Sequence, residues 1–63
     1  MKTFYDVQQL LKRFGSFIYT GHRLGDIELM MDEVRQLYTD NLIQADEFQK
    51  AVLILRAEQN KFQ

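Results

Sequence analysis

Apolar residues recur at three- and four-residue spacing along most of this chain, which is typical of amphipathic helices. Residues 3–14 form the first predicted helix, with an apolar face of Phe4, Val7, Leu10, Leu11 and Phe14. Residues 25–40 form the second, with a face of Ile27, Met30, Met31, Val34, Leu37 and Tyr38. Residues 45–60 form the third, where Phe48, Ala51, Val52 and Leu55 repeat at helical spacing.

A tight turn is predicted between the second and third helices. Asn41 can adopt the left-handed conformation that closes a helix C-terminus. Gln44 and Glu47 have the spacing of a capping box, although Gln replaces the usual Ser or Thr. Leu42 and Ile43 are apolar, so we expect them to close the end of the core. These signals predict an antiparallel helical hairpin.

The first helix has equally local boundaries. Thr3 is a plausible N-cap, with Asp6 in the first turn where a carboxylate suits the helix dipole, and Gly15 suits the left-handed position beyond the last turn. Residues 15–24 then read as an extended connection, since their apolar run is too short for a sheet strand. We expect Phe17 or Ile18 to anchor this connection in the core.

Together these elements predict one all-α domain spanning residues 1–63. It is a small three-helix bundle, with a tight hairpin between helices two and three and an extended linker between helices one and two. The chain has no cysteine and no proline and is 46% hydrophobic, which fits a packed bundle without disulfides and excludes disorder. No apolar run is long enough to cross a membrane, and no signal peptide is evident, so we expect a cytoplasmic protein.

Charge is distributed unevenly along the chain. Residues 1–25 contain four basic and one acidic side chain, a net +3, whereas residues 26–63 contain four basic and eight acidic, a net −4. The basic part either forms a local anion-binding surface or is an ordinary solvated face attracted to the acidic part.

Two groups of residues carry the candidate binding chemistry. On the polar face of the first helix, Tyr5 lies with Lys12, beside Arg13; its ring either stacks a base or packs on a neighbouring segment. Residues 19–23, with Tyr19, His22 and Arg23, form an exposed loop before a helix N-terminus. This loop either grips phosphate or is a plain connection.

Catalysis is not expected from this sequence. Thr20 and His22 resemble a nucleophile and a base, but no orienting carboxylate is evident next to them. The acidic residues near the start of the second helix are better explained as a dipole-matched face than as a metal site. We expect no cofactor, no bound metal and no small-molecule substrate, because a bundle this small leaves little room for a pocket.

Four stretches of the sequence resemble the YqgQ family of low-GC Gram-positive bacteria. They are Thr3–Lys12, Phe17–Gly21 with Arg23, Asp26–Met30 and Ala51–Leu55. The resemblance covers roughly residues 3–58 and implies a three-helix bundle. It also implies a role, proposed for this poorly characterised family, in binding single-stranded nucleic acid.

The leading functional prediction is a non-catalytic module that binds single-stranded RNA or DNA. Its candidate contacts are Tyr5, Lys12, Arg13, Tyr19, His22 and Arg23. The alternative is a protein-interaction module or weak homodimer with no nucleic-acid role. Its motive is the acidic helical part of the chain together with Leu29 and Leu53, which lie off the predicted apolar faces. The third helix is so apolar around Leu53 that it is either central to the bundle or part of a dimer contact.

Overall fold

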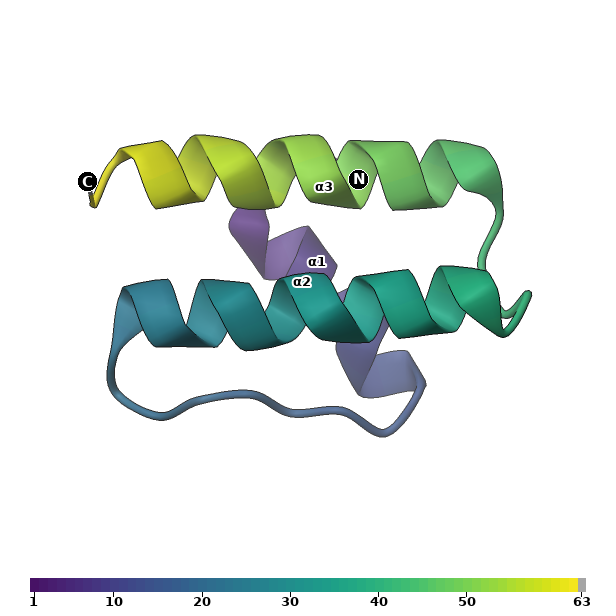
Figure 1. Ribbon diagram of the computed structural model, residues 1–63, viewed down its shortest axis with the longest axis horizontal. Helices are drawn as coiled ribbons and strands as arrows, with labels where there is room; N and C mark the ends of the chain where they lie inside the picture. The colour runs from purple at the N-terminus through teal and green to yellow at the C-terminus, as the bar shows by residue number, and fades with distance from the viewer. Residues whose placement is uncertain (63) are drawn as a thin grey trace.

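The computed structural model describes residues 1–62 and contains three helices: α1 (Phe4–Arg13), α2 (Arg23–Thr39) and α3 (Ala45–Asn60). α2 and α3 lie side by side as an antiparallel hairpin, and α1 crosses one face of that hairpin (Figure 1). The predicted all-α three-helix bundle is therefore confirmed. None of the described helices is long and apolar enough to span a lipid bilayer.

Local capping interactions fix the ends of α1 and the turn after α2. The Thr3 hydroxyl accepts a hydrogen bond from the Asp6 backbone N–H (3.2 Å), and the Asp6 carboxylate accepts one from the Thr3 N–H (3.0 Å). These bonds form a capping box. Gly15 and Asn41 both adopt positive φ angles, 87° and 60°, as predicted. In the turn, the Gln44 N–H donates to the Glu47 carboxylate at 3.3 Å.

The start of α2 differs from the prediction by two residues. The helix begins at Arg23 rather than at residue 25, so Arg23 belongs to its first turn and not to an exposed loop. The reason is an unforeseen N-cap: the ring nitrogen Nδ1 of His22 accepts a hydrogen bond from the Gly25 N–H at 3.1 Å. That bond satisfies one of the amide groups that a helix N-terminus leaves free.

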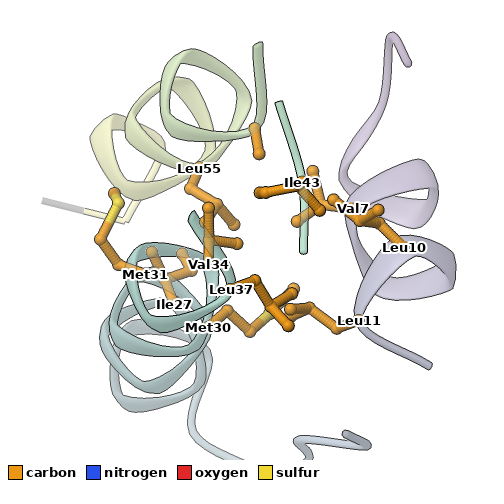
Figure 2. Packing of buried hydrophobic residues seen from close by; sticks show 11 residues of the cluster. Val7, Leu10, Leu11, Ile27, Met30, Met31, Val34, Leu37, Ile43 and Leu55 are labelled. Atoms are coloured by element: carbon orange, nitrogen blue, oxygen red, sulfur yellow. The ribbon is translucent and has the colours of Figure 1, made fainter. Parts of the chain in front are cut away.

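Side chains from all three helices meet in one core (Figure 2). Its buried members are Val7, Leu10, Leu11, Ile27, Met30, Met31, Val34, Leu37, Ile43, Ala51 and Leu55. Ile43 closes the hairpin end of the core as expected, but its neighbour Leu42 is exposed. Two other predicted core rings lie at the margin: Phe14 caps α1 and is exposed, and Tyr38 stacks on Phe48 with ring centroids 4.5 Å apart.

The linker between α1 and α2 runs along α2 on the side away from α3 (Figure 1). Ile18 is its anchor and packs against the core. At its end, the backbone N–H and the hydroxyl of Thr20 both donate to Asp26, at 2.8 and 2.6 Å. The linker is therefore held at both its middle and its end.

Candidate nucleic-acid interface

Two aromatic rings project from the linker into solvent. Phe17 is 79% exposed and Tyr19 is 74% exposed, while Ile18 between them is turned into the core. This alternation is typical of an extended chain, in which residues i and i+2 lie on one side, about 6.5–7 Å apart. The sequence predicts either Phe17 or Ile18 as the core anchor, and it does not identify Phe17 as a surface residue. The apolar Ile18 between two aromatics was the signal that could have revealed it.

The polar face of α1 meets the linker at Phe17. Tyr5 is 63% exposed, and Gln8 and Lys12 follow it at three- and four-residue spacing along the same side of the helix. Phe17 lines a small hollow together with Gln8 of α1, which links the two groups. We refer to Tyr5, Lys12, Phe17 and Tyr19 as the aromatic surface.

The two predicted arginine contacts do not lie together. Arg13 pairs with Glu47 at 3.8 Å, near the start of α3, whereas Arg23 pairs with Glu58 at 3.3 Å, near its end. Eleven residues separate the two glutamates, which is about 16 Å along a helix. The guanidinium groups are thus anchored at opposite ends of α3 and do not form one cationic cluster.

Arg23 has a set of contacts that ties the three helices together. Its guanidinium lies over the ring of Phe4 in α1, 4.4 Å from the centroid, and 5.7 Å from that of Phe62, beyond α3. It also forms an ion pair with Glu58, whose side chain is only 15% exposed. Glu58 forms a second ion pair, with Lys61 at 3.2 Å. The cation–π contacts and the ion pair make Arg23 a structural residue of the bundle.

The hydroxyl, imidazole and carboxylate groups near the start of α2 form a capping network. The Thr20 hydroxyl donates a hydrogen bond to the Asp26 carboxylate and accepts one from the His22 backbone N–H at 3.3 Å. The Thr20 hydroxyl therefore donates to Asp26 and not to His22, whose ring nitrogen Nδ1 accepts from the Gly25 N–H, so the two side chains are not paired as a nucleophile and its base. The hydrogen bonds from Thr20 lower the pKa of Asp26, chiefly the bond from its side chain. This network stabilises a helix start.

Lys12 differs from both arginines because it forms no ion pair with any described residue. It is exposed at the C-terminal end of α1, where it also complements the helix dipole. Across residues 1–62, no group of three or more histidine, aspartate or glutamate side chains is arranged to hold a metal ion.

These features define a small all-α domain whose most distinctive surface is formed by exposed aromatic rings. The model of the YqgQ-like family matches residues 1–61. The uncharacterized protein YqgQ of Bacillus subtilis (strain 168) is 48% identical over 58 residues, which cover 92% of this chain and 82% of that protein. The chain belongs to the YqgQ-like family, which confirms the resemblance noted in its sequence.

Proposed function

We propose that this protein is a non-catalytic, cytoplasmic module that binds single-stranded RNA or DNA through the aromatic surface. The observation that carries the proposal is the pair of exposed rings, Phe17 and Tyr19, on a linker that Ile18 and Thr20 hold in place. Rings held in this way stack bases at little entropic cost, because the backbone beneath them is already ordered.

The spacing of the rings favours a single strand over a duplex. Side chains two residues apart in an extended chain lie about 6.5–7 Å apart, roughly twice the 3.4 Å rise per nucleotide of a stacked strand. Neighbouring bases can meet both rings only if the strand is stretched and its bases are unstacked. A flexible single strand allows this, whereas a duplex holds its bases together.

Stacking supplies most of the proposed affinity, and phosphate contacts supply less. The aromatic surface contains one cation, Lys12, which forms no ion pair with a described residue. The two arginines, Arg13 and Arg23, lie outside this surface and have carboxylate partners. Each phosphate contact with a single strand contributes about 0.7 to the slope of log affinity against log salt. We therefore expect binding to weaken only gently as salt rises.

The test is fluorescence anisotropy with labelled single-stranded RNA and DNA oligonucleotides at low and physiological salt. Phe17→Ala and Tyr19→Ala should each weaken binding by about 5- to 150-fold, the range for losing one base stack. Leu42→Ala is the matched control, because it also removes an exposed apolar side chain but lies in the hairpin turn. Unchanged affinity in the Phe17→Ala/Tyr19→Ala double variant would refute the proposal, as would equal affinity for a duplex.

A second pair of variants tests the phosphate contact. Lys12→Gln should reduce the salt slope by about 0.7, since it removes one cation from the surface. Lys50→Gln removes the same charge from an exposed site on α3 and should leave the slope unchanged. Equal slopes for the two variants would show that only net charge matters and would contradict the assigned site.

A further inference from the structure

The outer face of α3 carries an exposed leucine at the middle of the helix. Leu53 is 68% exposed, although the residues on both sides of it, Val52 and Ile54, pack against the core. Along this face, a stripe with alternating four- and three-residue spacing consists of Asp46, Lys50, Leu53, Ala57 and Asn60. The spacing is that of the contact positions in a helix pair, with apolar residues at Leu53 and Ala57 and polar residues at the other positions.

A groove lies directly beside Leu53. It measures about 370 Å³ and runs between the start of α1 and the last turns of α3. Its lining is apolar at Phe4, Leu53, Ile54 and Ala57 and polar at Lys2, Thr3, Glu58 and Lys61. The same face therefore offers a projecting leucine beside a partly apolar recess.

We propose that α3 pairs in antiparallel orientation with α3 of a second copy of this chain, centred on Leu53. In such a pair, a seam residue inserts into a hole of four residues on the facing helix. The hole that receives Leu53 is formed by Lys50, Leu53, Ile54 and Ala57 of the partner. The leucine thus enters an apolar site with a small residue at one corner and the aliphatic stem of a lysine at another.

Charge at the ends of the stripe selects the antiparallel orientation. Centring on Leu53 places Asp46, in the first turn of α3, opposite the partner's Asn60 and the partner's Lys61, just beyond the last turn. The two-fold axis repeats this contact, so each dimer gains two opposite-charge contacts. A parallel pair would instead bring Asp46 against Asp46 and Lys61 against Lys61.

The pairing surface lies apart from the two linker rings of the aromatic surface. The linker that carries Phe17 and Tyr19 runs along the side of α2 that faces away from α3 (Figure 1). Two copies joined through α3 would therefore leave both linkers open to solvent. Self-association through Leu53 and base stacking on Phe17 and Tyr19 can therefore be tested separately.

Sedimentation equilibrium over a range of concentrations up to the millimolar tests the pairing. The apparent mass should rise from that of the 7.6 kDa monomer towards twice that value. Leu53→Asp should hold the mass at the monomer value, while circular dichroism confirms that the variant remains helical. Leu29→Asp, which changes an exposed leucine on α2, is the control and should dimerise like the unaltered chain. A monomer at every concentration would overturn the proposal and leave this face to a different protein.

Charge reversal tests the orientation. Asp46→Lys and Lys61→Asp should each weaken association, because each creates two like-charge contacts per dimer. The double variant Asp46→Lys/Lys61→Asp restores both opposite-charge contacts and should recover most of the affinity. Failure of this rescue, with both variants still helical, would overturn the antiparallel arrangement. Dimerisation that persists in Leu53→Asp would overturn the assigned surface.

Discussion

Replacing Arg23 with alanine should destabilise the domain by about 1–2 kcal/mol. The ion pair with Glu58 contributes about 0.5–1 kcal/mol, at the upper end for partly exposed pairs because the glutamate is largely shielded from solvent. The stacking of the guanidinium on the Phe4 ring, at 4.4 Å, contributes a further 0.5–1 kcal/mol or so. For a domain of this size, such a loss lowers the melting temperature by about 5–15 °C.

Urea unfolding followed by circular dichroism measures this loss directly. Arg13→Ala is the matched control, since Arg13 also pairs with a glutamate of α3 but at 3.8 Å and with a side chain that is 67% exposed. We expect it to cost no more than about 0.5 kcal/mol. A double-mutant cycle of Arg23→Ala with Glu58→Gln then separates the ion pair from the ring contact, because the ring contact survives in the glutamine variant.

Equal destabilisation by the two arginine variants would refute the structural role assigned to Arg23. The result also matters for binding experiments. Weaker binding by Arg23→Ala would partly reflect a smaller fraction of folded protein. Its affinity must therefore be compared with that of the unaltered chain under conditions where both are folded to the same extent. Arg13→Ala does not carry this complication.

The core and the caps lead to two further predictions. Leu55→Ala should lower the free energy of unfolding by about 2–5 kcal/mol, because Leu55 is fully buried. This is a large share of the roughly 3–9 kcal/mol of stability expected for a 63-residue domain. Urea unfolding measures the loss, and a loss below about 1 kcal/mol would contradict the packing. The pKa values of Asp26 and Asp6 are lowered in the folded protein, so both ionised carboxylates stabilise the fold above about pH 4. This contribution to the free energy of unfolding is lost as the pH falls through the pKa values of the folded protein. Asp26→Asn should therefore flatten the loss of stability in acid, as measured by urea midpoints at successive pH values, and an unchanged acid slope would contradict the role of the Thr20 bonds.

Local signals in the sequence were sufficient to place most helix ends. The Thr3–Asp6 capping box, the left-handed Gly15 and the left-handed Asn41 each depend on residues within one turn of each other. The start of α2 was misplaced because His22 is not a common N-cap. Its ring nitrogen replaces the usual hydroxyl or carboxylate oxygen, and nothing in the spacing of residues 22–25 distinguishes this cap from a loop.

Contacts between distant segments could not be read from the sequence. Arg23 was predicted as a loop cation free to meet phosphate, yet its partner Glu58 lies 35 positions away. Similarly, composition gave no reason to choose between Phe17 and Ile18 as the anchor of the linker, or between Leu42 and Ile43 at the hairpin. In each pair the β-branched residue, Ile18 or Ile43, is the more buried one. The docking of α1 decides the first choice, and the geometry of the hairpin turn decides the second.

The connection between α1 and α2 is longer than the five-residue turn between α2 and α3, and this difference implies an order of folding. Closing a short hairpin costs less chain entropy than bringing α1 back across the length of α2, so the hairpin should form first. Alanine-scanning kinetics would then give high φ-values at Val34 and Leu55 and low ones at Val7. Native-state amide exchange should likewise show α1 opening before the hairpin does. The linker, which is ordered between the two, would lose its fixed shape whenever α1 detaches.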